Sequence, residues 1–219
     1  EEGTLEDDQN RRDFTINALF YDPVADSVVD LVNGQKDLDA RVIRCVGLPD
    51  ERFAEDHLRM LRAVRFSVVL DFAIESSTAE AIRKHATAIA RISPERIRIE
   101  LVRMLVESSR PGHAIECLDQ LGLLPHILPE IAAMKGVEQP PQFHPEGDVF
   151  QHTVDALNLL SPAPAFPEWP EDEQGPALPL LAMSVLLHDL GKPPTAQLID
   201  GRIRFNNHAE AGAGLAAGI

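Results

Sequence analysis

The segment EDHLRMLRAVRF, from Glu55 to Phe66, places two carboxylates beside arginines that recur every three residues. On a helix, Glu55, Arg59 and Arg62 would lie within a narrow arc, with Asp56 at its flank. An aspartate beside an arginine offers an acceptor next to several donors. Cytosine and adenine each carry an amino donor beside a ring-nitrogen acceptor, whereas uracil and guanine present the opposite arrangement. The pair Asp56–Arg59 therefore fits selection of C and A over U and G.

The same segment has a simpler interpretation as an ion-paired surface helix. Exposed pairs at i and i+4 stabilise a helix by only about 0.3–0.5 kcal/mol each. Leu61, Val64 and Val68 would face a core on another side of that helix. The segment alone is compatible with both interpretations.

A second arginine motif, RRDFTINAL, lies at the entrance of a predicted strand. Arg11 and Arg12 precede Asp13, Thr15 and Asn17. Guanidinium groups suit phosphate because their planar fork donates two parallel hydrogen bonds and does not lose its proton. Two exposed loop arginines would give the same pattern, so this motif needs support from elsewhere in the chain.

Histidines gather in the last third of the chain, where His188 is followed directly by Asp189. Together with His144, His152 and His208 they could converge on one ion. Imidazole nitrogens and a carboxylate suit a transition metal better than calcium, and such a metal could activate water for phosphoester hydrolysis. A His–Asp pair that only caps a helix is the alternative. The remaining histidines have no such context and are expected to be ordinary surface or core residues: His57, His85, His113 and His126.

The charge of the chain is unevenly distributed. The net charge is −15, yet residues 51–110, between acidic flanks, carry a small net positive charge. Nearly all of the basic side chains in this segment are arginines. This pattern is compatible with RNA bound on one face. The hydrophobic content of 44% with 25% charged residues is typical of a globular protein.

Several features argue against a membrane or secreted protein. No apolar run approaches the roughly 18 residues that span a bilayer, and the opening EEGTLEDDQN lacks the pattern of a signal peptide. Cys45 and Cys117 form no motif, so we expect two buried thiols in a reducing compartment, the cytoplasm.

The periodicity predicts an α+β chain in which a small β-containing part precedes a mostly helical remainder. Residues 1–13 read as an exposed acidic lead-in, and the Pro-rich, acidic stretch 161–179 as a surface loop. Strands are expected at about 17–22 and 27–31, followed by a turn, a short helix and a further strand. Helices are expected at about 55–70, 77–90, 94–108, 111–121 and 125–133, and then within QFHPEGDVFQHTVDALNLL, LLAMSVLLHDLGKP and FNNHAEAGAGLAAG.

Taken in order, these segments resemble the bacterial tRNA nucleotidyltransferase family, the CCA-adding enzymes related to poly(A) polymerases, of the kind with a C-terminal HD domain. The segments that carry the resemblance are TLEDDQNRRDFTINAL, DLVNGQKDLDARVIRCV, EDHLRMLRAVRF, ISPERIRIELVRML, FHPEGDVFQHT, LLHDLGKP and FNNHAEAG. The resemblance implies the end of a nucleotidyltransferase head at 1–50. It implies a helical neck and body that select nucleotides and bind RNA at 51–140, and the first part of a helical HD domain at 141–219.

The resemblance also implies a function, which is addition of CCA to tRNA 3′ ends from CTP and ATP without a nucleic-acid template. It implies that Arg12 binds the triphosphate and that Asp56 and Arg59 pair with the base. Arg62 and Arg65 would complete the nucleotide site. The oligomeric state and the choice among CCA-, CC-, A- and poly(A)-adding relatives are left open by the sequence.

For the HD part, the resemblance suggests His152, His188 and Asp189 as ligands of a divalent transition metal, with His208 as a further ligand and His144 as a weaker one. The alternative function is accordingly a metal-dependent HD phosphohydrolase acting on RNA or on nucleotide phosphoesters.

One departure from the family pattern concerns the catalytic carboxylates. The family carries a Gly-Gly motif and an Asp-x-Asp strand that ligate Mg²⁺, and nothing of this kind precedes Arg11. The acidic pair Asp7–Asp8 corresponds to the lead-in of the arginine motif. We therefore expect an internal fragment of a longer enzyme, without catalytic residues of its own, whose Mg²⁺ ligands lie outside it.

Overall fold

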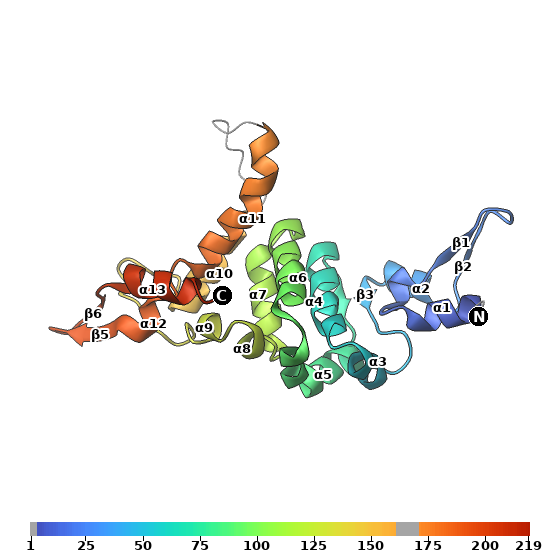
Figure 1. The fold of residues 1–219 in the computed structure, drawn as a ribbon, viewed down its shortest axis with the longest axis horizontal. Coiled ribbons are helices and arrows are strands. Elements are labelled where there is room, and N and C mark those ends of the chain that lie inside the picture. Colours follow the sequence, from blue (N-terminus) through green and yellow to red (C-terminus); the bar gives the residue numbers. More distant parts are fainter. Residues whose placement is uncertain (1–3, 161–170) are drawn as a thin grey trace. The chain divides into compact units, whose positions relative to one another are not determined.

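The N-terminal acidic segment forms helix α1 (Leu5–Arg11), because Thr4 and Asp7 make a capping box at its first turn. The computed structural model describes residues 4–160 and 171–219, apart from a few side chains. The described residues form two compact units, divided between Glu100 and Leu101, and Figure 1 shows their elements.

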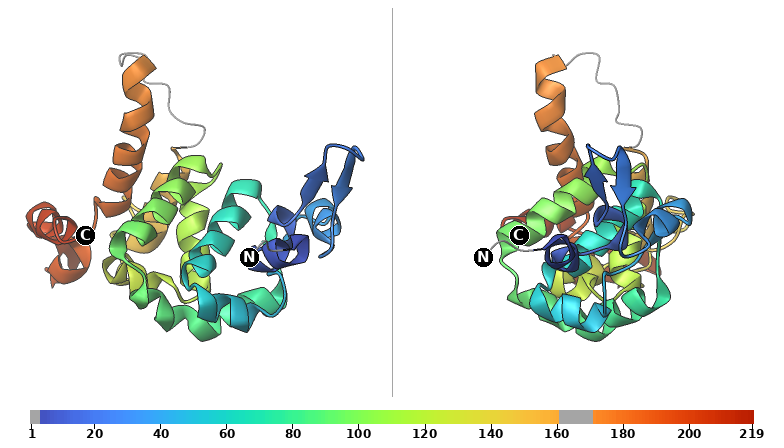
Figure 2. Two further views of the ribbon diagram at one scale, coloured as in Figure 1. Left: turned by 45° about the vertical axis from the view of Figure 1, so that its right-hand side comes forward. Right: turned by 90° about the vertical axis from the view of Figure 1, so that its right-hand side faces the viewer.

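The first unit contains the predicted hairpin. Strands β1 (Phe20–Asp22) and β2 (Ser27–Val29) pair antiparallel, and Figures 1 and 2 show them as a thin two-stranded ribbon. The carboxylate of Asp22 accepts hydrogen bonds from the backbone N–H groups of Val24 and Ala25, which fixes the turn. The hairpin prediction is confirmed, with strands shorter than expected.

The short helix expected after the hairpin is α2 (Gly34–Asp39). A Cβ at Gly34 would lie 2.1 Å from the carbonyl oxygen of Thr15, so only glycine permits this approach. Strand β3 (Val42–Ile43) follows and pairs in parallel with β4 (Ala73–Ile74), a strand that the periodicity did not indicate. The other elements that begin in this unit are η1 (Thr15–Asn17), α3 (Pro49–Glu55), α4 (Leu58–Leu70), α5 (Ser76–His85), η2 (Ala86–Arg91) and α6 (Pro94–Glu107).

The helix predicted at 55–70 is α4, which begins three residues later than expected, at Leu58. Glu55 is instead the last residue of α3, a helix that was not predicted, and the helical conformation breaks between the two helices at Asp56 and His57. Asp56 has extended backbone angles, and its carboxylate accepts a hydrogen bond from the N–H of Leu58, so it ends one helix and starts the next. The apolar face of α4 is buried as predicted, through Leu61, Val64 and Val68. The core of the unit also contains fully buried side chains from other elements: Phe14, Ile43, Phe53, Ile82 and Ile89.

The second unit is largely helical, and Figure 1 shows its elements in yellow-green to red. Its helices are α7 (Pro111–Gln120), α8 (Leu124–Ile127), α9 (Pro129–Ala132), α10 (Val149–Asn158), α11 (Glu171–Leu187), α12 (Lys192–Thr195) and α13 (His208–Ala216). A Cβ at Gly112 would lie 2.1 Å from the carbonyl oxygen of Val154, so α7 and α10 are in backbone contact. The loop predicted at 161–179 lies partly outside the described residues, and its second part is wrong because α11 begins at Glu171.

A β-hairpin interrupts these helices and was not predicted. Strands β5 (Ala196–Ile199) and β6 (Arg202–Phe205) pair antiparallel around Asp200 and Gly201, both of which have positive φ angles. This conformation is typical of a two-residue Asp-Gly hairpin turn. Among the described residues, no helix is both long and apolar enough to cross a membrane.

Candidate functional site

The carboxylate of Asp56 performs two structural tasks at the start of α4. Its Oδ1 accepts from the N–H of Leu58 at 3.0 Å, and its Oδ2 lies 3.0 Å from Nη2 of Arg96 on α6. The side chain is about one-third exposed. Asp56 is thus fixed in position at its Oδ1 while its Oδ2 edge faces an exposed, exchangeable partner.

Arg59 is held by three acceptors. Its Nη1 lies 2.7 Å from Oε2 of Glu55 and 3.1 Å from the carbonyl oxygen of Arg52, and its Nη2 lies 3.0 Å from the carbonyl oxygen of Arg11. Glu55 therefore orients Arg59 by an ion pair. The predicted partners Asp56 and Arg59 are neighbours, but each side chain is paired with a different residue.

Arg62 connects the two arginine motifs of the sequence. Its Nε forms an ion pair with the buried carboxylate of Asp13, which also accepts from Nδ2 of Asn17 at 2.6 Å. The motif RRDFTINAL is thereby attached to α4. Arg12, one residue before Asp13, is half exposed and pairs with Asp8 at 3.0 Å.

Arg65 differs from the other arginines of α4. Its side chain is only 4% exposed, and its Nε lies 2.6 Å from Oε2 of the equally buried Glu100. The guanidinium also lies 4.3 Å from the centre of the Phe66 ring. Direct contact between Arg65 and a ligand would require this buried pair to open.

These contacts gather several guanidiniums around the start of α4 in the first unit. They belong to Arg12, Arg59, Arg62 and Arg96. Arg96 was not among the predicted site residues. Its signal in the sequence is its place in the arginine-rich segment ISPERIRIE, but its pairing with Asp56, 40 residues away, has no local signature. Such an edge of donors and acceptors suits a flat polar group with attached phosphates.

The second unit brings three of the predicted metal ligands together. His152 lies on α10, and His188 and Asp189 follow α11 directly. Nε2 of His188 lies 3.1 Å from Oδ2 of Asp189, and Nε2 of His152 lies 3.9 Å from the same oxygen. One ligand atom from each residue falls within 4.8 Å of the others, a spacing that fits a transition metal.

The surroundings of Asp189 also fit a cation. Its Oδ2 is buried and receives no hydrogen bond of normal geometry, although Nζ of Lys192 lies 2.7 Å away. Burial alone would raise the pKa of Asp189, but its contacts with His188 and Lys192 outweigh burial and lower that pKa to about 2. The contact with Asp189 in turn raises the pKa of His188 above its ordinary value.

The other two predicted histidines are placed differently. Nδ1 of His208 lies 2.8 Å from the carbonyl oxygen of Phe205, and His208 is not part of the group described above. His144 belongs to an adjacent group with Glu146 and His152. A backbone hydrogen bond and the two imidazoles lower the pKa of Glu146 to about 2.

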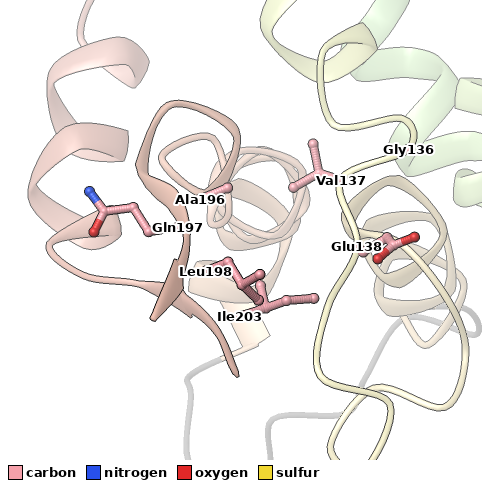
Figure 3. A pocket seen from close by; sticks show the side chains of 7 residues that line it. All are labelled: Gly136, Val137, Glu138, Ala196, Gln197, Leu198 and Ile203. Atoms are coloured by element: carbon pink, nitrogen blue, oxygen red, sulfur yellow. The ribbon is translucent and has the colours of Figure 1, made fainter. Parts of the chain in front are cut away.

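A shallow pocket of about 490 Å³ lies between residues 136–138 and the β5–β6 hairpin. Val137, Leu198 and Ile203 form its apolar part, and Figure 3 shows the side chain of Gln197 pointing away from Val137. None of the predicted site residues lines it.

Two parts of the chain match known protein families. Residues 1–44 match the family described as poly A polymerase head domain. Residues 71–135 match the family described as probable RNA and SrmB-binding site of polymerase A.

Curated relatives match nearly all of the chain. The chain is 38% identical to the multifunctional CCA protein of Halorhodospira halophila over 216 residues. The aligned region covers 96% of this chain and 48% of the relative. It is 36% identical over 223 residues to the CC-adding tRNA nucleotidyltransferase of Thermus thermophilus, covering 98% and 47%. The chain thus spans about half the length of the curated relatives it matches.

Solved structures share the fold. The CCA-adding enzyme of Bacillus stearothermophilus in complex with CTP matches 84% of this chain and 55% of its own, with 26% identity and a TM-score of 0.57. A tRNA-processing enzyme in an apo form matches 98% of this chain and 53% of its own, with a TM-score of 0.64. At 22% identity this second match concerns the fold alone.

Proposed function

Because the chain belongs to the tRNA nucleotidyltransferase family, which includes the poly(A) polymerases, we propose that the protein adds CCA to tRNA 3′ ends from CTP and ATP without a template. The observation that carries the proposal is the Asp13–Arg62 ion pair. It attaches the motif that contains Arg12 to the helix that begins beside Asp56 and carries Arg59, so one site draws on both motifs.

Base selection is assigned to Asp56 and Arg59. After its contact with Arg96 breaks, Oδ2 of Asp56 would accept a hydrogen bond from the amino group of cytosine or adenine, and Arg59 would donate one to the neighbouring ring nitrogen. Glu55 and the carbonyl oxygen of Arg52 hold the Arg59 guanidinium in position for this contact. Uracil and guanine would place a carbonyl against the carboxylate, and such a mismatch costs binding energy.

Phosphate binding is assigned to the remaining arginines. Arg12 is about half exposed and would bind the triphosphate, and Arg62, which is less exposed, would contact the same nucleotide. Arg65 also belongs to the proposed site, with a supporting role: its buried pair with Glu100 would fix the position of α4, which carries Arg59 and Arg62.

Members of this family use divalent metal ions, and we propose Mg²⁺ for this protein. When bound, Mg²⁺ stabilises the negative charge that develops on the transferred phosphate. The carboxylates next to α4 do not fit it, because Asp13 is paired with Arg62 and Asp56 with Arg96. We therefore assign no Mg²⁺ ligand in this chain. The reaction joins the tRNA 3′ oxygen to the α-phosphorus and releases pyrophosphate.

The test is an Asp56→Ala substitution in the intact protein. Incorporation of UMP and GMP relative to CMP and AMP should rise by roughly 5- to 150-fold, the value of one base-reading contact, while the Kd for tRNA stays unchanged. Asp50→Ala is the matched control, because it also removes an exposed carboxylate from this unit, one that pairs with Lys84 and His85. Unchanged nucleotide selectivity in Asp56→Ala would refute the assignment.

A second activity, metal-dependent phosphohydrolysis by an HD domain, is favoured by the group of His152, His188 and Asp189. A divalent transition metal bound there would supply an activated water. Phosphodiesterase activity of the intact protein with Mn²⁺, Co²⁺ or Ni²⁺ should be lost in His188→Ala and Asp189→Ala, while CCA addition persists. Absence of hydrolysis with all three ions would refute this second function.

We propose the cytoplasm as the location, since tRNA is the proposed substrate. Both cysteines are free thiols in the structure. Burial raises the pKa of Cys45 to about 12 and that of Cys117 to about 11, so both stay protonated and unreactive.

A further inference from the structure

We propose that Glu146 is a positioning residue that fixes the tautomer of His152, so that His152 presents Nε2 to a divalent transition metal held with His188 and Asp189. The inference rests on the phosphohydrolase function proposed above. Glu146 was not among the residues that the sequence indicated, and it lies in the segment before α10, six residues from His152.

The first step concerns the ring of His152. Its Nδ1 lies 2.7 Å from Oε1 of Glu146, and an ionised carboxylate can only accept a hydrogen bond. Nδ1 must therefore carry the proton, and a neutral His152 has a free lone pair at Nε2. That Nε2 faces Oδ2 of Asp189, 3.9 Å away.

The second step concerns His188, which follows the same rule with a different acceptor. Its Nδ1 lies 2.7 Å from the carbonyl oxygen of Val185, which likewise can only accept. Its Nε2 lies 3.1 Å from Oδ2 of Asp189. Two histidines thus reach one carboxylate with the same ring nitrogen, each oriented by an acceptor on its far side, as is usual for metal-ligating histidines.

The third step concerns charge. Two neutral imidazoles with protons on Nδ1 would place three acceptor atoms against one another at Asp189, two Nε2 atoms and one carboxylate oxygen. Such an arrangement is unfavourable without a cation. Lys192 lies 2.7 Å from the same oxygen but also donates to Oε1 of Gln139 at 2.6 Å, so it supplies only part of the compensation. A divalent ion, or in the metal-free protein a proton on Nε2 of His188, would supply the rest.

The fourth step concerns how Glu146 is held. Nδ1 of His144 lies 2.9 Å from the same Oε1, and the rings of His144 and His152 pack edge to face with centres 4.9 Å apart. Two residues later, Asp148 caps α10 by accepting from the N–H of Gln151 at 2.8 Å. The segment that carries Glu146 is therefore attached to the helix that carries His152.

A ligand role for Glu146 is the competing explanation. Its carboxylate could hold a second ion with His144 and His152, because these ligand atoms also lie within 4.8 Å of one another. His152 would then bind two ions through both ring nitrogens and would have to lose both ring protons. A single ion on the Nε2 side requires no such step, so we favour the positioning role.

The test compares Co²⁺ binding to the intact protein and its variants by isothermal titration calorimetry. Wild type should bind one Co²⁺ at the histidine group, and Glu146→Ala should bind it about 10- to 100-fold more weakly at the same stoichiometry. Glu146→Gln should lose less, since its amide oxygen still accepts from Nδ1. Glu116→Ala is the matched control: Glu116 makes a similar contact with His113, at 3.0 Å, outside this group.

A second measurement reports the tautomer directly. In ¹⁵N NMR spectra of the metal-free protein, His152 should be protonated at Nδ1 in wild type and in Glu146→Gln, and should become a mixture of tautomers in Glu146→Ala. If Glu146→Ala does not fold, wild type and Glu146→Gln still decide the question, because protonation of His152 at Nε2 in both would overturn the proposal.

The remaining outcomes separate this inference from the function on which it rests. Unchanged Co²⁺ affinity in Glu146→Ala overturns the positioning role alone. Two ions in wild type and one in Glu146→Ala also overturn it, because Glu146 would then be a ligand. Normal Co²⁺ binding without phosphodiesterase activity overturns the hydrolase function alone, and no Co²⁺ binding by wild type overturns both.

Discussion

The carboxylates around α4 and the carboxylate of the histidine group are used in different ways. Around α4, each carboxylate meets an arginine: Glu55 meets Arg59, Asp13 meets Arg62, Glu100 meets Arg65 and Asp56 meets Arg96. In the second unit, Asp189 meets two imidazoles and a lysine, and its buried Oδ2 receives no hydrogen bond of normal geometry.

The difference follows from the side chains involved. A guanidinium is charged at every accessible pH, so a partly buried arginine requires a counter-charge in the folded protein whether or not a ligand is bound. An imidazole can be neutral, so histidines can converge before any cation arrives. The binding proposed at α4 would therefore exchange existing partners, whereas the metal binding proposed at the histidine group would add a partner to Asp189.

The largest expected effect tests whether the α4 pairs are part of the fold. Arg65→Ala leaves Glu100 buried and unpaired, and should lower the free energy of unfolding by about 3–5 kcal/mol in urea denaturation. Arg103→Ala is the control, because its pair with Glu107 is exposed and should contribute less than about 0.5 kcal/mol. A double variant, Arg65→Met with Glu100→Leu, should recover most of the loss. A loss below about 1 kcal/mol for Arg65→Ala would leave Arg65 free for a ligand.

The next effect tests the histidine group. Asp189→Asn removes the charge on which both Nε2 atoms converge, and should weaken Co²⁺ binding by more than the roughly 10- to 100-fold expected for a supporting residue. Asp155→Asn on α10 is the matched control, since its carboxylate accepts a hydrogen bond from Nε2 of Gln151 at 2.9 Å and is not part of the histidine group. Equal Co²⁺ affinities for both variants would show that the convergence at Asp189 has no role in metal binding.

Local patterns predicted much of the fold but not where helices begin and end. Periodicity and turn residues predict the hairpin at β1–β2 and the apolar face of α4, and the motifs carry the resemblance to the family. The break between α3 and α4 is not predicted, because the arginine and leucine spacing starts at Glu55 and includes Asp56, whose role as a cap depends on its backbone angles. The β5–β6 hairpin does have a local signal, the Asp200–Gly201 turn, in which both residues have positive φ angles.

The pairings within the site were harder to predict than its members. Arg96 and Glu100 approach α4 from 40 and 35 residues away, and only the tertiary fold determines which arginine each carboxylate meets. Glu146 is only six residues from His152 in the sequence, but the proposed role of Glu146 depends on which ring nitrogen of His152 its carboxylate contacts. Residue types can indicate a chemistry, whereas partner choice requires coordinates.

A smaller effect concerns Glu75, a carboxylate of the first unit that serves a helix end. Burial would raise its pKa, but hydrogen bonds from Ser77 and Thr78 outweigh burial and lower the pKa to about 2. Because the folded-state pKa lies below the ordinary value of 4.5, its contribution is complete above pH 4.5 and is lost as the pH falls toward 2.

Glu75→Ala should therefore cost about 1 kcal/mol of unfolding free energy at neutral pH, as for other helix caps, and the difference from wild type should shrink in acid. Glu75→Gln keeps an acceptor and provides the control, since it should not contribute to the pH dependence. Thermal unfolding between neutral pH and pH 2 measures both. A difference between wild type and Glu75→Ala that is constant with pH would contradict the assignment.

The smallest expected effect bears most directly on partner exchange at α4. Arg96→Ala removes an exposed partner of Asp56, so stability should change by no more than about 1 kcal/mol. If a base must displace Arg96, the variant should bind CTP up to about 5-fold more tightly, the equivalent of that energy. The gain should disappear in the Asp56→Ala background, because nothing is then left to release, and a double-mutant cycle of CTP affinities isolates this coupling. Weaker CTP binding by Arg96→Ala in both backgrounds would instead mean that Arg96 contacts the nucleotide, and the contrast with the histidine group would then disappear.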